Sequence, residues 1–166
     1  MPSPPDALRG AASGGHGSRR VDDAGLTPGL ALRRARVDEL AACAGLYVRV
    51  LRDTFTWIPP ERHRAEDFLA AARDEEVYVA VEGGRILGMA ALYRPQTFLH
   101  SLYVTERGRG IGKALLEHVI AAAGGRLSLK CQAANLGAQA FYVREGFRCV
   151  EAGEDGGVAW LRFVRG

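Results

Sequence analysis

The chain has 166 residues, of which 48% are hydrophobic and 25% charged, a composition typical of a globular protein about one domain in size. Its formal net charge of +3 suits an anionic ligand, but the Lys and Arg residues form no long block, so a nucleic-acid-binding protein is not indicated. No apolar run approaches the roughly 20 residues that a membrane-spanning helix requires, and the cysteines form no CxxC pair of a zinc site or disulfide framework.

Residues 1–29 differ in composition from the remainder of the chain. Proline and glycine are concentrated there without apolar periodicity, so we expect a disordered extension ahead of a folded domain over residues 30–166. The opening stretch MPSPPDALRGAASGGHGSRR has no apolar segment of the kind found in secretory signals. Because the cysteine pattern also suits reduced thiols, we expect a cytoplasmic protein.

The first half of the domain indicates a strand, two helices and a hairpin. The alternating stretch GLALRRARV predicts the strand, and Asp38 is expected to cap a helix that runs to Leu51. Paired prolines interrupt the helical pattern, and Pro60 can begin a second helix through ERHRAEDFLAAAR. The run EVYVAVEGGRILGMAALYRP holds two β-rich segments around a Gly-Gly pair, which predicts a hairpin.

The second half indicates the order strand, helix, strand, helix, strand, strand. TFLHSLYV predicts a strand that ends at a glycine-rich turn, and apolar residues at helical spacing predict a helix from Ile111 to Ala122 that stops at Gly124-Gly125. RLSLKC is a short strand, NLGAQAFYVREG a helix, and FRCVEAG and GVAWLRFV are two closing strands. This order predicts a mixed α/β domain with one β-α-β crossover in its middle.

The glycine-rich turn RGRGIGK, residues 107–113, precedes the helix that starts at Ile111. Backbone N–H groups converge at a helix N-terminus, and glycine lets a phosphate approach them closely. A Walker A loop does not fit, because Arg107 stands where the first glycine should be and Ala114 follows Lys113. The dinucleotide pattern GxGxxG also fails, because its third glycine would fall on Lys113.

A different pattern does fit this turn. Arg107-x-x-Gly110-x-Gly112 resembles the [QR]-x-x-G-x-[GA] signature of the GNAT acyl-CoA N-acyltransferases. By itself this short pattern would also suit a strand-to-helix turn without a ligand. After one more strand, however, NLGAQAFYVREGF resembles the second characteristic GNAT segment, N-x-x-A-x-x-F-Y-x-x-x-G-F, at Asn135, Ala138, Phe141, Tyr142, Gly146 and Phe147.

The resemblance covers about residues 30–165. It implies a GNAT-like mixed central sheet of about six to seven strands flanked by about four helices. It also implies acetyl-CoA as the acetyl donor, with no metal. One departure concerns the turn itself, because only Thr105 and Glu106 separate Val104 from Arg107, fewer residues than relatives usually have. The shortening bears on the conformation of the turn but leaves its glycines in place.

The resemblance assigns two sets of donor-binding residues. The pantetheine arm and thioester would contact the backbone of Leu102, Tyr103 and Val104, and also Asn135, which can equally be the N-cap of its helix. The pyrophosphate would bind the backbone N–H groups of the turn, with added charge from its basic side chains; these residues are Arg107, Gly108, Arg109, Gly110, Ile111, Gly112 and Lys113.

Two residues are expected to carry the proton transfers. Tyr142 occupies the position of the family's usual general acid beside the leaving thiolate; alternatively it is a packing residue. An amine with a pKa of about 10 must lose a proton before attack, and many relatives place a carboxylate on the strand before the turn. TFLHSLYV contains none, so His100 is the candidate base, with a purely structural histidine as the alternative and Asp53 and Glu61 as weaker candidates.

The acceptor site is read from RDTFTWIPPER, the segment that commonly forms a wall of the acceptor pocket in this family. Phe55 and Trp57 could stack on an acceptor while Asp53 or Glu61 attracts its amine, or these residues simply pack between the two helices. A covalent route would use Cys131, which ends a strand near the expected thioester. Cys43 and Cys149 resemble core residues, and direct transfer is favoured.

These expectations combine into one function and one main alternative. The first is an N-acetyltransferase that moves an acetyl group from acetyl-CoA to a primary amine of an unidentified small molecule or peptide, by direct attack in a ternary complex. The alternative is an acyl-CoA-binding regulatory domain without significant turnover. The expected partner is the amine acceptor, with a homodimer left open and neither nucleic acid nor membrane expected.

Overall fold

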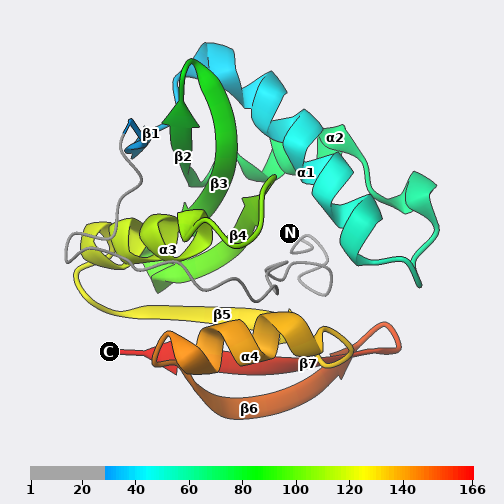
Figure 1. Cartoon of the computed structure of the whole chain (residues 1–166). Coiled ribbons are helices and arrows are strands. Elements are labelled where there is room, and N and C mark those ends of the chain that lie inside the picture. The colour runs from blue at the N-terminus through cyan, green and yellow to red at the C-terminus, as the bar shows by residue number, and fades with distance from the viewer. Residues whose placement is uncertain (1–28) are drawn as a thin grey trace.

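A computed structural model describes residues 29–166, which form one sheet of seven strands with four α-helices. The strand order is β1-β2-β3-β4-β5-β7-β6 (Figure 1). The elements are β1 Ala31–Arg34, α1 Leu40–Thr54, α2 Ala65–Ala71, β2 Glu76–Glu82, β3 Arg85–Tyr93, β4 Phe98–Val104, α3 Ile111–Ala122, β5 Leu127–Gln132, α4 Leu136–Arg144, β6 Arg148–Asp155 and β7 Val158–Arg165. The predicted fold class is confirmed, and the expected disordered extension lies outside the described residues.

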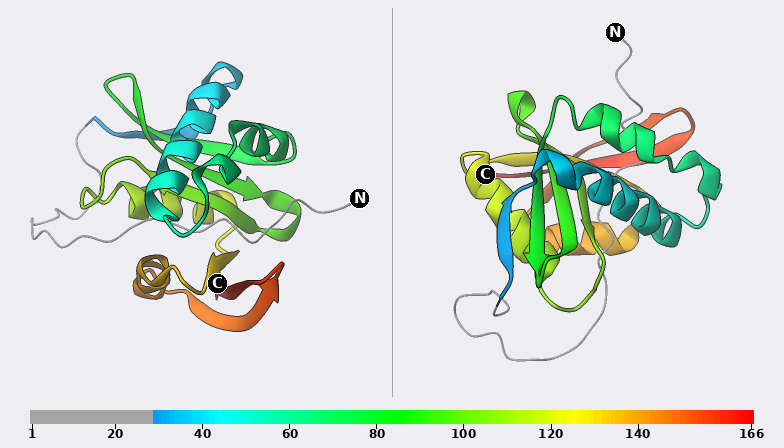
Figure 2. Two further views of the ribbon diagram at one scale, coloured as in Figure 1. Left: turned by 90° about the vertical axis from the view of Figure 1, so that its right-hand side faces the viewer. Right: turned by 90° about the horizontal axis from the view of Figure 1, so that it is seen from above.

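The sheet is covered on both faces by helices. Alternate residues of a strand point to opposite faces, and Val79 and Ala80 on β2 accordingly belong to two separate buried clusters. The Val79 cluster packs α1 and α2, while the Ala80 cluster packs α3 and α4 (Figures 1 and 2). We call these the α1/α2 face and the α3/α4 face. No helix among the described residues has both the length and the hydropathy needed to cross a membrane.

Strands β4 and β5 are parallel and pair over only two positions. Phe98 lies opposite Ser128 and Leu99 opposite Leu129, and within residues 29–166 no further pair joins the two strands. Figure 1 shows the consequence: β1–β4 with α1–α3 form one group, and β5–β7 with α4 form another. We call the diverging segments, residues 100–104 of β4 and 130–132 of β5, the fork.

A β-bulge lies where the fork begins. On β3, Leu92 pairs with Leu99 and the preceding residue Ala91 pairs with Ser101, so His100 is an extra residue in β4. A bulge bends the strand that contains it and increases its twist. The bend at His100 therefore gives a local reason for β4 to turn away from β5 directly after Leu99.

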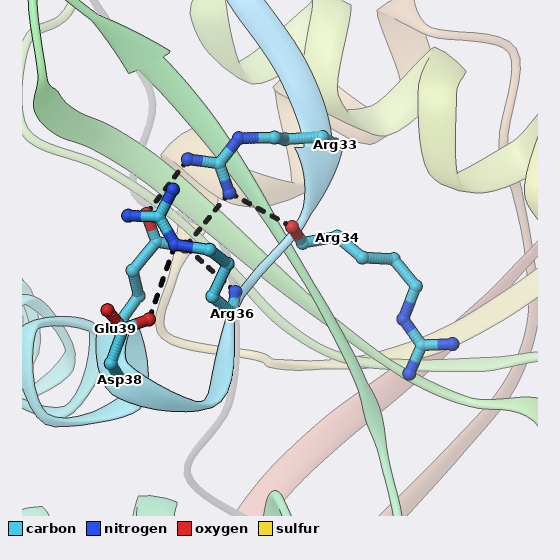
Figure 3. Close-up of polar contacts among 5 residues, drawn as sticks. All are labelled: Arg33, Arg34, Arg36, Asp38 and Glu39. Atoms are coloured by element: carbon cyan, nitrogen blue, oxygen red, sulfur yellow. Dashed lines mark hydrogen bonds and ion pairs between the residues drawn. The ribbon is translucent and has the colours of Figure 1, made fainter.

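The start of α1 differs from the expectation that Asp38 is its cap. Asp38 lies inside a short 3-10 turn, Val37–Glu39, and Glu39 is the residue that organises the corner (Figure 3). The Glu39 carboxylate accepts hydrogen bonds from the backbone N–H of Arg36 at 2.8 Å and from both terminal nitrogens of Arg33 at 2.8 and 2.9 Å. Because Arg33 binds both oxygens of the Glu39 carboxylate, Glu39 and not Asp38 stabilises the start of α1.

The second helix is shorter than predicted. Pro60 starts only a 3-10 turn, Pro60–Arg62, because His63 and Arg64 then adopt extended backbone angles, and α2 begins at Ala65. The other elements agree with the sequence. The hairpin turns at Gly83 and Gly84, both with positive φ, and α3 spans the predicted Ile111–Ala122.

Candidate active site

The glycine-rich turn presents the N-terminus of α3 at the open end of the fork. Gly108 and Gly110 adopt φ values of 77° and 74°, the left-handed region that suits glycine. Gly110 is the N-cap residue, and as a glycine it has no side chain that could accept from the first N–H groups of α3. Such a helix start offers backbone N–H groups and a positive dipole end to an anion. The shortened segment is anchored by Thr105, whose N–H and Oγ1 bond the Leu87 carbonyl at 2.9 and 3.1 Å.

The basic side chains of the turn are not equivalent. Arg109 donates to Glu106 at 2.8 Å and to Glu82 at 2.9 Å, and these hydrogen bonds raise the pKa of its guanidinium. Its charge is thereby compensated by two carboxylates. Lys113 lies 3.8 Å from Glu145 with a largely exposed side chain, and Arg107 is also exposed. Lys113 is thus better placed than Arg109 to add charge for an anion at the turn.

The two signature glycines differ in what they require. Gly110 needs its positive φ, whereas Gly112 does not. A Cβ on Gly112 would lie 3.7 Å from Val104 and 3.8 Å from Phe141, which is ordinary van der Waals contact. The protein itself therefore tolerates one extra carbon at Gly112, and only a larger side chain would press on its neighbours or fill the turn.

Alternate backbone groups of β4 are directed into the fork. Thr105 donates to Leu87, so by antiparallel alternation Tyr103 bonds Met89 of β3 as well. The N–H and C=O groups of Leu102 and Val104 then point toward the β5 side. Of the three residues expected to bind the donor through their backbone, Leu102 and Val104 are oriented for it, while Tyr103 faces β3.

Tyr142 lies on α4 with its ring held by three phenylalanines. It is 2% exposed, and its ring centroid is 5.2 Å from Phe141, 5.5 Å from Phe147 and 6.3 Å from Phe163. Phe163 pairs with Leu129, the last residue of β5 that pairs with β4. The ring of Tyr142 is therefore fixed on the α3/α4 face near the closed end of the fork.

Asn135 is the N-cap of α4, which is one of the two roles expected for it. Its Oδ1 accepts from the N–H of Ala138 at 3.1 Å, and the residue is 7% exposed. This cap fixes the start of the helix that carries Tyr142.

His100 contacts a carboxylate from another segment of the chain. Its Nδ1 is paired with Oε1 of Glu75, which lies between α2 and β2 and has a side chain only 2% exposed. The imidazole stacks on Tyr93, with centroids 5.9 Å apart and planes at 11°, and meets Phe98 edge-on at 4.9 Å. Sequence reasoning missed Glu75, because nothing in the spacing links it to a strand that begins more than twenty residues later.

The predicted acceptor wall divides into a buried and an exposed part. Phe55 is fully buried and belongs to the core on the α1/α2 face, so it supports the wall from behind and does not face solvent. Trp57 meets Phe55 edge-on at 5.3 Å and is half exposed, and its Nε1 donates to Oε1 of Gln132 on β5 at 3.3 Å. Glu61 is exposed in the 3-10 turn that follows, and Asp53 is exposed on α1.

Two buried polar residues near this wall were not anticipated from the sequence. Gln132 is 2% exposed, and its Nε2 has no hydrogen-bond partner within residues 29–166. His63, whose ring lies 6.2 Å from Phe55, is equally buried and neither of its ring nitrogens has a partner in the described part of the chain. Burial, and then the charge of Arg52, lowers the pKa of His63, so this imidazole is neutral at physiological pH.

The cysteines do not supply a nucleophile. Cys131 is fully buried, and burial raises the pKa of its thiol to about 12, so it stays protonated at neutral pH. Burial likewise raises the pKa of Cys43 to about 11. The expectation that Cys149 lies in the core is wrong: it is exposed, because β6 is an edge strand whose residues around it are exposed. Among the described residues no group of three His, Cys, Asp or Glu side chains is placed to hold a metal ion.

Comparison with known proteins gives a consistent picture. The model of the acetyltransferase (GNAT) family matches residues 36–147, more than half of the chain. A mycothiol acetyltransferase from Corynebacterium aurimucosum is 40% identical over 86 residues, 49% of this chain and 24% of that protein. The chain thus spans about a quarter of the length of this curated relative.

Solved structures extend the similarity to the fold. The ribosomal-protein-alanine N-acetyltransferase from Brucella melitensis has a TM-score of 0.61 and 25% identity, over 81% of this chain and 98% of that one. A GCN5-related N-acetyltransferase from Rhodopseudomonas palustris has a TM-score of 0.70 and 19% identity, over 84% and 97%. The PaiA N-acetyltransferase from Thermoplasma acidophilum, solved in complex with coenzyme A, has a TM-score of 0.65 and 18% identity, over 80% and 97%.

Proposed function

The chain belongs to the acetyltransferase (GNAT) family, and we propose that it transfers an acetyl group from acetyl-CoA directly to a primary amine of a small molecule or peptide. The observation that carries this proposal is that the glycine-rich turn lies at the open end of the fork. The turn lies at one end of β4, directly after Val104, and the bulge at His100 lies at the other. About 13 Å of extended strand separates Val104 from His100.

The residues present fit an elongated donor with an anionic part. The start of α3, with Gly110 as its N-cap and with Gly108 and Gly110 in left-handed conformations, suits the pyrophosphate of acetyl-CoA. The Leu102 and Val104 backbone groups suit the amides of the pantetheine arm and the carbonyl of the thioester, as preorganised donors and acceptors. Acetyl-CoA supplies a thioester carbonyl that an amine can attack.

The proton transfers are assigned to residues at the closed end of the fork. The acceptor nitrogen enters as an ammonium group and loses two protons while its bond to the acetyl carbon forms and the carbon–sulfur bond breaks. His100 takes the first proton and passes it to solvent. Tyr142 gives its proton to the departing thiolate and recovers the second one from the nitrogen, so that one proton is released per turnover.

The buried cysteines favour direct transfer over a covalent acetyl-enzyme. A thiol with a pKa of about 12, such as Cys131, is almost entirely protonated at neutral pH and is a poor nucleophile. Cys149 is exposed on the edge strand β6, which β7 separates from β5. Replacement of Cys131 by Ala is therefore expected to leave turnover in place.

A thiol-release assay tests the proposal. The chain is incubated with acetyl-CoA and a panel that includes small amines, amino acids and peptides starting with alanine, since the relatives' names include both a mycothiol and a ribosomal-protein-alanine acetyltransferase. Free thiol that appears only when an amine is present, with an acetylated product by mass spectrometry, supports the transferase. Tight coenzyme A binding by calorimetry without turnover on any amine would instead support an acyl-CoA-binding regulatory domain.

A further inference from the structure

A carboxylate reaches β4 although the strand itself has none. Glu75 comes from the segment between α2 and β2, and its nearly inaccessible side chain pairs with Nδ1 of His100. Burying a carboxylate is costly unless it is paired and hydrogen-bonded. Glu75 has such a partner in His100, so the contact places a buried carboxylate directly beside the candidate base.

The His100 ring is also fixed from two other directions. Tyr93 stacks against one face of it and Phe98 packs edge-on, so contacts from the α2–β2 segment, β3 and β4 together determine its orientation. The ionisable groups in these contacts are the Glu75 carboxylate and the Tyr93 phenol. An imidazole held in this way cannot exchange its two nitrogens by flipping without losing the carboxylate contact.

The fixed ring lies where the backbone opens. His100 is the bulged residue, it follows the last β4 residue that pairs with β5, and it precedes Ser101, where pairing with β3 resumes. It therefore lies at the closed end of the fork, toward which an acyl chain bound along β4 would point.

We propose that Glu75 is the positioning residue of the base: it holds Nδ1–H of His100 so that Nε2 is the nitrogen that takes the proton from the acceptor amine. In a neutral imidazole one nitrogen donates and the other accepts, and a carboxylate on Nδ1 selects the tautomer with its proton there. When Nε2 takes up the amine proton, the ring becomes an imidazolium whose charge Glu75 compensates. The proton then leaves Nε2 to solvent.

This inference rests on the proposed function, so its test needs a measurement that does not depend on turnover. Nitrogen chemical shifts of the histidine rings report the tautomer, and the His100 signals are identified by their absence in His100→Gln. We expect the Nδ1–H form of His100 in the parent chain and a mixture of tautomers in Glu75→Gln. An unchanged His100 tautomer in Glu75→Gln would overturn the inference, whether or not the chain proves to be an acetyltransferase.

Kinetics test the consequence of this contact. We expect Glu75→Gln to lower kcat/KM by on the order of 10- to 100-fold, the range found when the hydrogen-bond partner of a metal-bound histidine is removed, with coenzyme A affinity unchanged.

A matched control and a double variant complete the design. Glu76→Gln removes the neighbouring carboxylate, which binds Arg94 and Tyr78 instead of His100, and should leave the His100 tautomer and kcat/KM unchanged. Glu75→Gln should lower kcat/KM little further once His100 is already Gln, because both changes disrupt the same Glu75–His100 pair. Equal losses in the parent and His100→Gln backgrounds, or an equal effect of Glu76→Gln, would reduce Glu75 to a structural residue. Coenzyme A binding without turnover in the parent would refute the proposed function itself.

Discussion

Trp57 donates a hydrogen bond from its indole Nε1 to Oε1 of Gln132, 3.3 Å away, and so joins the α1–α2 connection to the end of β5. Trp57 belongs to the group that contains β1–β4, Gln132 belongs to the group that contains β5–β7, and the two residues are 75 positions apart in the chain. Because β4 and β5 pair at only two positions, side-chain contacts such as this one and the Arg165–Glu117 pair also join the two groups. The Trp57 contact leaves the Gln132 Nε2 as a buried donor that has no partner within residues 29–166.

The unpartnered amide leads to a first prediction. A buried donor without a hydrogen bond costs about 1–3 kcal/mol, so Gln132→Leu, which keeps the volume and removes the amide, should leave the melting temperature unchanged or higher. If Nε2 instead serves an oxygen of the bound acceptor, the same variant should raise the KM for the amine while the affinity for coenzyme A stays constant. Thermal unfolding, calorimetry and steady-state kinetics measure the three quantities.

Trp57→Phe is the matched variant for this contact. It keeps an aromatic ring against Phe55, but removes the N–H that donates to Gln132 together with one of the two fused rings. A similar rise in the KM for the amine would indicate that the Trp57 contact orients Gln132. An unchanged KM for the amine in both variants would place the acceptor elsewhere.

The two glycines of the turn give a second prediction, in which similar substitutions have different effects. Gly110→Ala forces a side chain into the left-handed region at φ 74°, which costs about 1–2 kcal/mol and disturbs the turn, so both the melting temperature and coenzyme A affinity should fall. Gly112→Ala places a methyl group at ordinary contact distance and should change the melting temperature little.

Gly112→Val separates packing from ligand binding in the same turn. Its branched side chain should fill the turn and weaken coenzyme A binding, measured by calorimetry, while thermal unfolding measures how far it also presses on Val104 and Phe141. Parent-like coenzyme A affinity in folded Gly112→Val would show that the pyrophosphate does not bind at this turn.

Patterns local in sequence predicted the fold and the turn well. The hairpin at Gly83-Gly84 and the helix Ile111–Ala122 depend on residues that are close in the chain, and both were confirmed. The contacts that distinguish the site were not predictable in this way. The His100–Glu75 pair depends on a bulge in β4, and the Trp57–Gln132 contact depends on how far the fork opens, neither of which has a sequence pattern.

The corner at the start of α1 gives a prediction about pH. The Arg33 hydrogen bonds, followed by the Arg36 N–H, lower the pKa of Glu39 from 4.5 to about 2. A carboxyl group whose pKa is lower in the folded state stabilises the fold above its unfolded pKa, and this contribution is lost as pH falls from about 4.5 toward about 2. Glu39→Gln should therefore unfold at lower urea concentration than the parent at pH 7, and the difference should shrink below pH 4.5.

Asp38→Asn is the control for this experiment. Asp38 pairs with Arg36 at 3.3 Å, but both side chains are exposed, and exposed pairs contribute about 0–1 kcal/mol (Figure 3). Its urea midpoint should follow that of the parent at every pH. A gap between the parent and Glu39→Gln that persists unchanged down to pH 2 would mean that the charge of Glu39 is not what stabilises the corner.

Tyr142→Phe gives the last prediction, on the proton donor. The substitution removes one oxygen and keeps the ring among Phe141, Phe147 and Phe163, so the fold and coenzyme A affinity should be preserved. Loss of general-acid assistance should lower the rate of the chemical step by on the order of 10²-fold or more. Rapid-quench measurement of a single turnover reports this step without interference from product release.

Tyr78→Phe provides the comparison that separates chemistry from packing. Tyr78 is as buried as Tyr142, and its hydroxyl donates to Glu76 at 2.6 Å on the opposite side of β4 from β5, two strands away from the fork. Its loss should lower the melting temperature, because a hydrogen bond to a charged group contributes about 1.5–3 kcal/mol, while the single-turnover rate stays near the parent value. If both variants slow the single turnover equally, Tyr142 acts through packing and the thiolate takes its proton from another source. A loss confined to Tyr142→Phe places the proton donor on α4, because the two substitutions remove the same atom from equally buried rings.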